Sequence, residues 1–135
     1  MKRLSWFFVR VLAVTFLLFS SGREGWALML KMSLEELTDA SQSIIVGTVT
    51  DIRSQWNEER TAIYTYITIL VTEQVKGTSY PREVTIRQPG GKVEKIGMKV
   101  SDVPTFEKGE EVVVFLEMEK GEEMFRVTGM TQGKF

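Results

Sequence analysis

The pattern of apolar and polar positions predicts a short helix followed by a series of β-strands. Ser33 and Glu36 have the spacing of a capping box, in which each side chain bonds the backbone amide of the other residue. Leu34, Leu37 and Ala40 recur at intervals of three, so they should share one face of the helix. We therefore expect a short helix that begins after Ser33 and ends by about Ser41.

The clearest strand signal covers residues 63–75, where apolar and polar positions alternate with a period of two. The segment is longer than a typical strand of about 5–6 residues. A long strand with apolar groups on both faces is expected where a sheet coils into a barrel. Ile67 and Ile69 should face the barrel interior, together with at least one of Val113 and Phe115. Further strands are predicted at residues 43–52, 83–88, 93–100, 111–118 and 124–130.

Glycine and proline set the local geometry of these strands. Gly47 interrupts the first strand, which indicates a bulge, a tight bend or a close approach of two backbones. Pro89, Gly90 and Gly91 together predict a turn with positive φ. The pattern contains no internal repeat and no linker, so residues 28–135 are predicted to form one domain. We expect a mainly β fold, a single barrel of five or six strands with one short N-terminal helix.

Residues 1–27 have the order of a secretory signal peptide. Lys2 and Arg3 give a positive start, a long apolar segment follows, and small residues precede a cleavage site after Ala27. The alternative is a retained membrane anchor, because the apolar segment has nearly the length that spans a bilayer. Arg10 lies within that segment, where a central charge costs about 2.5–3.5 kcal/mol on insertion scales. Both alternatives export the remaining chain, either secreted or periplasmic, or anchored and facing outside the cytoplasm.

Composition and charge remove several classes of function. The sequence has no cysteine and no histidine, which excludes disulfides, thiolate zinc sites, thiol nucleophiles and a histidine base. Its 17 basic and 18 acidic residues leave a net charge of −1. Removal of residues 1–27 leaves 13 basic and 17 acidic residues and a net charge of −4, which disfavours a nucleic-acid partner. The aspartates lie far apart in sequence, so we expect no metal and no cofactor.

Several segments resemble a known group of exported domains. They are residues 40–49 (ASQSIIVGTV), a long strand ending in Lys76 and Gly77, and residues 87–91, 106–110 and 112–116. In order and kind they resemble uncharacterised exported bacterial proteins. They are more distantly similar to netrin-type modules and to the N-terminal domain of tissue inhibitors of metalloproteinases. The resemblance implies an OB-like barrel, although Ser41 stands where those families often have aspartate. Those inhibitors chelate zinc through an N-terminal cysteine, so inhibition does not transfer to this chain.

Four residues are candidates for a binding site. Trp56 is expected in a polar loop at residues 54–60, either as a binding anchor or as a lid over one end of the barrel. Gly90 and Gly91 expose backbone in a loop that either contacts a partner or simply turns the chain. Gln88 is the neighbouring side chain that would act with them.

We predict an exported, non-enzymatic binding module whose partner is another exported protein, with membrane contact only if the N-terminal segment is retained. One alternative is a carboxylate-dependent hydrolase or lyase with its cleft at the barrel mouth. The adjacent glutamate pairs at residues 35–36, 58–59, 110–111 and 122–123 diverge, so no catalytic residue is assigned. A second alternative is an oligonucleotide-binding OB fold, in which Tyr64 and Tyr66 would stack on bases, but this needs a basic groove.

Overall fold

The computed structural model describes residues 31–78, 82–121 and 124–135. The predicted signal peptide at residues 1–27 lies outside these ranges. Within the described ranges, no helix combines the length and the apolar character needed to cross a bilayer. Residues 31–135 form one compact unit.

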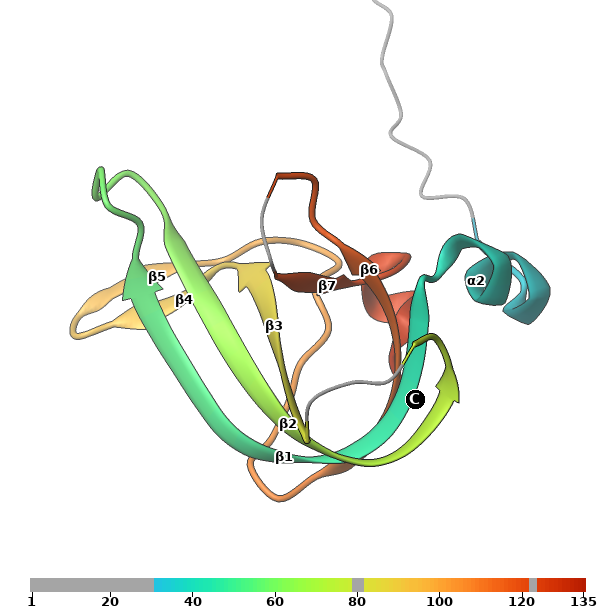
Figure 1. Ribbon diagram of the computed structural model, residues 1–135. Helices are drawn as coiled ribbons and strands as arrows, with labels where there is room; N and C mark the ends of the chain where they lie inside the picture. Colours follow the sequence, from blue (N-terminus) through green and yellow to red (C-terminus); the bar gives the residue numbers. More distant parts are fainter. Residues whose placement is uncertain (1–30, 79–81, 122–123) are drawn as a thin grey trace, which may run out of the picture. The chain divides into compact units, whose positions relative to one another are not determined.

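The described chain is mainly β, as predicted (Figure 1). Its elements, in chain order, are the helix α2 (Leu34–Ala40), the strands β1 (Ser43–Trp56), β2 (Ile63–Lys76), β3 (Glu83–Pro89), β4 (Gly91–Val93), β5 (Ile96–Met98), β6 (Glu111–Met118) and β7 (Phe125–Val127), and the 3-10 helix η1 (Met130–Gly133).

Five of the strands form a closed ring in the order β1-β2-β3-β7-β6. Neighbours in the ring are antiparallel except β3 and β7, which are parallel and joined through one residue pair, Ile86 and Phe125. Strands β4 and β5 form a separate hairpin, and β4 packs against β1 and β2. The ring is therefore weakly closed at the β3–β7 contact.

A close approach of two strands explains the glycine in β1. A Cβ atom on Gly47 would lie 2.4 Å from the carbonyl oxygen of Leu70 and 2.5 Å from Cγ2 of Ile69. The register between β1 and β2 also shifts between Val46 and Gly47. Both the irregularity and the close approach predicted for this glycine are confirmed.

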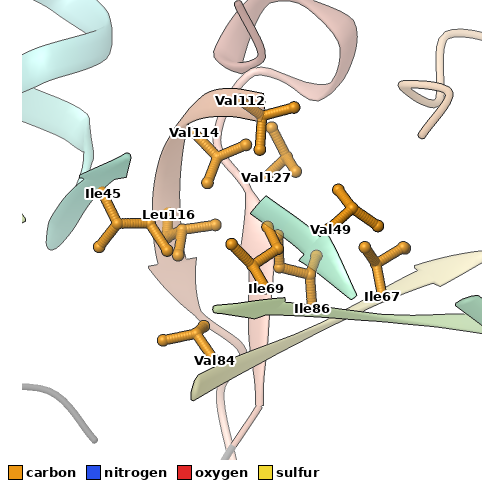
Figure 2. Close-up of a cluster of buried hydrophobic side chains, with 10 residues drawn as sticks. All are labelled: Ile45, Val49, Ile67, Ile69, Val84, Ile86, Val112, Val114, Leu116 and Val127. Atoms are coloured by element: carbon orange, nitrogen blue, oxygen red, sulfur yellow. The ribbon is translucent and has the colours of Figure 1, made fainter. Parts of the chain in front are cut away.

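The ring encloses a cluster of buried branched aliphatic side chains (Figure 2). Ile67 and Ile69 are fully buried in it, as predicted from the alternation in β2. The other members come from each of the remaining ring strands: Ile45, Val49, Val84, Ile86, Val112, Val114, Leu116 and Val127. Phe106 packs against this cluster from the segment that precedes β6.

The predicted register of β6 was wrong by one residue. Val112, Val114 and Leu116 face the ring interior, whereas Phe115 packs outside it with Leu37 and Ile44. Strand β6 is covered on both faces, by the ring interior and by the cluster of Leu37, Ile44 and Phe115. Every position from 112 to 116 is accordingly apolar. A uniformly apolar run carries no alternation from which the inward face could be predicted.

Helix α2 begins with the predicted capping box. The Glu36 amide donates to the Ser33 hydroxyl at 3.1 Å, and the Ser33 amide donates to the Glu36 carboxylate at 2.7 Å. Of the three residues predicted to share one helix face, only Leu37 is buried, while Leu34 is 60% exposed and Ala40 is also exposed. One turn of this face meets the sheet, where Phe115 and Ile44 cover Leu37.

Several element boundaries also differ from the predictions. Residues 54–56 belong to β1 rather than to a loop, and the connection to β2 begins at Asn57. The predicted strand at residues 93–100 is replaced by the β4–β5 hairpin, in which Glu94 takes a φ of 53°. The strand predicted at residues 124–130 is shorter in the structure, where β7 ends at Val127 and the chain continues into η1. Phe135 then pairs with Val113 through both backbone hydrogen bonds.

Candidate functional site

The inner face of the ring changes from apolar to polar at one end of β2 and β3. In β3, Val84 and Ile86 point inward, and Gln88 follows at the next inward position. Across from it, Thr65 is paired with Gln88 in the strand register. The alternation along the strands therefore places an amide and a hydroxyl at the mouth of an otherwise aliphatic core.

The Thr65 hydroxyl is fully committed to the protein. It donates to the carbonyl of Gly90 at 2.7 Å and lies 2.9 Å from the Ser54 hydroxyl. Because a threonine hydroxyl has one hydrogen, Ser54 is the donor in the second contact. This chain of bonds joins β1, β2 and the β3–β4 link around the mouth.

The Gln88 amide is only half satisfied. Its Nε2 donates to the carbonyl oxygen of Pro104 at 3.1 Å, whereas its Oε1 is buried and has no hydrogen-bond partner among the described residues. A buried acceptor without a donor costs about 1–3 kcal/mol. Such atoms are rare in folded proteins, and each calls for an explanation, such as a functional role or a bound water or ion.

A cavity of about 470 Å³ lies at this end of the ring, and we call it the mouth cavity. Ile52, Thr65 and Ile67 contribute to its wall from the strands. Residues 88–91 line it at the β3–β4 link, and residues 99–106, here termed the strap, also line it. Its volume falls within the range of about 300–1,000 Å³ typical of small-ligand sites.

A second cavity, the side cleft, measures about 410 Å³. It is lined by Arg87 of β3, by Glu117 of β6 and by Arg126 of β7, close to the single β3–β7 contact. Gln88 and Pro104 line both the side cleft and the mouth cavity. The hydrogen bond between these two residues therefore stands where the two cavities adjoin.

The side cleft is charge-balanced. Arg87 Nη2 lies 2.8 Å from the Glu119 carboxylate, and Arg126 Nε lies 2.9 Å from that of Glu117. The Arg87 guanidinium also stacks over the Tyr64 ring, 4.8 Å from its centroid. The cleft thus presents aromatic and ion-paired groups rather than the basic groove that an oligonucleotide requires.

Glu117 and Glu119 are cleft residues that the sequence interpretation missed. The glutamate pairs noted from the sequence are adjacent residues, whose side chains diverge in a strand. Residues two apart share a strand face, so Glu117 and Glu119, which flank Met118, carried a detectable signal. Their arginine partners come from β3 and β7 and could not be assigned from spacing alone.

The strap is attached to the C-terminal segment. Lys134 Nζ donates to the Thr105 carbonyl at 2.5 Å and to the Glu110 carboxylate at 2.7 Å, and it lies over the Phe106 ring. The bond from Lys134, with a second from the Glu107 amide, lowers the pKa of Glu110 below its ordinary value. The Thr131 amide donates to the carbonyl of Asp102 at 3.0 Å.

The structure brings three of the four candidate residues together. Gln88, Gly90 and Gly91 all line the mouth cavity. Gly90 and Gly91 have φ values of 94° and 132°, so the predicted positive φ is confirmed. They link β3 to β4 instead of reversing the chain in a free turn, and the Gly90 amide extends the ladder by donating to the Ile63 carbonyl at 2.8 Å.

Trp56 does not join this group. It is the last residue of β1, half-buried and paired opposite Ile63, and it is not among the residues that line either cavity. Tyr64 lines the side cleft, whereas Tyr66 pairs with Arg87 further along the strands. Among the described residues, no group of three or more acidic side chains gathers closely enough to hold a metal ion.

Comparisons with protein-family models, with curated proteins and with solved structures found no match for this chain. The candidate site therefore rests on the geometry of its own residues.

Proposed function

We propose that this chain is an exported, non-enzymatic binding module that recognises another exported protein at the mouth of an OB-like barrel. The observation that carries the proposal is the buried Oε1 of Gln88, which lacks a partner within the described part of the chain and lies beside two cavities of ligand-binding size. A partner that donates a hydrogen bond to this oxygen would remove the penalty that the unbound chain carries.

The ring topology supports the OB-like assignment. An OB fold is a five-stranded, partly open Greek-key barrel. The ring order β1-β2-β3-β7-β6 and the single parallel contact between β3 and β7 are consistent with such a partly open barrel. The export assignment depends on the sequence of residues 1–27 and their positive, apolar and small-residue regions.

Binding accounts for the charged groups of the side cleft better than hydrolysis does. A carboxylate-dependent hydrolase needs two carboxyl groups that are free to exchange protons and attack the substrate. Here Glu117 is engaged by Arg126 and Glu119 by Arg87. Fixed pairs of opposite charge are suited to orienting a partner and rejecting mismatched ones.

Site-specific cross-linking in the cell that exports the protein would test this proposal. A photoreactive amino acid at Met98, in the wall of the mouth cavity, should capture one exported protein, whereas the same group at Gln55 on the exposed side of β1 should not. Gln88→Leu should reduce the capture at Met98 about tenfold, and Gln55→Leu should leave it unchanged. Equal capture by the two positions, or capture insensitive to Gln88→Leu, would contradict the proposal.

A further inference from the structure

The hydrogen bond that Gln88 makes in the unbound chain indicates which chemical group of a partner it would bind. A glutamine amide offers two N–H donors and one carbonyl acceptor, as the peptide group offers a donor and an acceptor. A residue in extended backbone presents its own N–H and C=O on the same side, and paired strands exchange both bonds through one residue. An amide facing such a residue can therefore donate and accept at once.

Pro104 satisfies only one half of this pairing. Its carbonyl accepts from Gln88 Nε2 at 3.1 Å, but a proline has no backbone N–H to return to Gln88 Oε1. No other group in residues 31–78, 82–121 and 124–135 donates to this buried oxygen. The strap thus occupies the Gln88 amide with the one residue type that lacks the matching backbone donor.

We propose that Gln88 reads peptide backbone, and that an extended segment of a partner protein displaces the strap at Pro104 and places a residue other than proline opposite the amide. This inference rests on the proposed binding function and specifies its ligand. The incoming residue accepts from Gln88 Nε2 and donates its N–H to Gln88 Oε1, so the amide becomes fully paired. Main-chain pairing of this kind is a common basis of peptide recognition.

The surroundings of Gln88 suit an extended chain. Gln88, Pro89, Val103 and Pro104 line both cavities, so movement of the strap away from Gln88 joins the mouth cavity and the side cleft into one groove. The two parts differ in character. The mouth cavity offers the aliphatic side chains of Ile52 and Ile67, and the side cleft offers two arginine–glutamate pairs.

The strap is held in a way that permits displacement. Residues 103–107 have neither helical nor strand structure. Among the described residues, two hydrogen bonds besides the Gln88 bond attach the strap to the C-terminal segment, from Lys134 to Thr105 and from Thr131 to Asp102. Ser101, Asp102 and Thr105 are exposed, so only a short apolar part of the strap leaves the sheet when it opens.

A peptide based on the strap itself provides a defined probe. Residues 99–107 already fit the site, so a nine-residue peptide with this sequence and alanine in place of Pro104 should bind the full chain, measured by NMR titration. The unaltered sequence and a peptide with N-methylalanine at the same position, both without that N–H, should bind at least tenfold more weakly. Lys134→Met releases the strap from Thr105 and should strengthen binding of the alanine peptide several-fold.

The variants of Gln88 decide the interpretation. In Gln88→Leu the three peptides should bind equally, and in Gln55→Leu the preference for the alanine peptide should remain. Three results would overturn the inference. They are equal binding of the three peptides to the unaltered chain, a preference that survives Gln88→Leu, and no binding at about 1 mM peptide, a concentration on the order of the strap's own effective concentration. If cross-linked capture still depends on Gln88 in that case, the proposed binding function stands, and only the proposal that Gln88 pairs with peptide backbone fails.

Pro104→Ala in the full chain gives a second test that needs no ligand. The new N–H should pair with Gln88 Oε1 and stabilise the closed strap, raising the melting temperature by about 4 °C or more. Loss of proline rigidity alone would lower it. A lower melting temperature, or an unchanged one, would contradict the proposed pairing. The same variant should also bind the alanine peptide about tenfold more weakly, because its own strap now satisfies Gln88.

Discussion

Gly91 and Thr65 approach so closely that a Cβ atom on Gly91 would lie 2.4 Å from the Thr65 hydroxyl oxygen. The same atom would lie 2.5 Å from the Ser54 hydroxyl. These hydroxyls hold the β3–β4 link against the ends of β1 and β2. The glycine therefore matters both for its φ of 132° and for the space beside it.

Gly91→Ala should destabilise the domain by about 1–3 kcal/mol, because the backbone conformation is strained for alanine and the side chain collides with Thr65. Denaturant unfolding measures the change. Gly97→Ala is the matched control, since its nearest neighbour would be 4.0 Å away, and it should change stability by no more than about 0.5 kcal/mol. Equal effects of the two substitutions would show that the mouth tolerates a methyl group.

Trp56→Ala should act on stability rather than on partner binding. The side chain is half-buried opposite Ile63 and lies outside both cavity walls, so its removal should cost about 1–3 kcal/mol of folding free energy. Cross-linked capture at Met98 should persist at a temperature where the variant is folded. Loss of capture with unchanged stability would identify Trp56 as a binding anchor. Gln55→Ala, at the exposed neighbour, is the control.

The Glu110–Lys134 contact should make stability depend on pH. Since the pKa of Glu110 is lowered in the folded chain, the contact stabilises the fold above the ordinary value of 4.5 and is lost as pH falls through the lowered pKa. Compared with Glu110→Gln, the unaltered chain should be more stable at pH 7 by less than about 1 kcal/mol, because the pair is near solvent. This difference should shrink in acid and in 1 M salt, as followed by denaturant unfolding. A difference that is constant with pH would show that the pair contributes nothing.

Processing of the N-terminus follows from the predicted signal peptide. Mass spectrometry of the exported protein should find Leu28 as the first residue, and Ala27→Trp should slow cleavage because the signal peptidase site requires a small residue. Recovery of the intact Met1 terminus in a membrane fraction would establish the retained anchor instead.

The local features of this chain were accessible from sequence because they depend on neighbouring residues. The Ser33–Glu36 box, the long alternation of β2 and the positive φ of Gly90 and Gly91 each arise within a few positions. The burial of Ile67 follows from the same alternation. Where the local pattern is uniform, as in β6, the inward face was predicted incorrectly. In α2, contact with the sheet decides that Leu37 is buried and Leu34 is not.

The features of the candidate site also differ in whether the sequence alone could reveal them. The interruption of an aliphatic strand pattern by Gln88, Gly90 and Gly91 was visible in the sequence, because polar and glycine positions can be seen directly in the chain. The contact between Pro104 and Gln88 became visible only in the folded chain, as did the lack of a partner for Gln88 Oε1 among the described residues. The same holds for the pairing of Arg87 and Arg126 with Glu119 and Glu117. These contacts join residues separated along the chain, and packing of the whole ring brings them together, which no local propensity encodes.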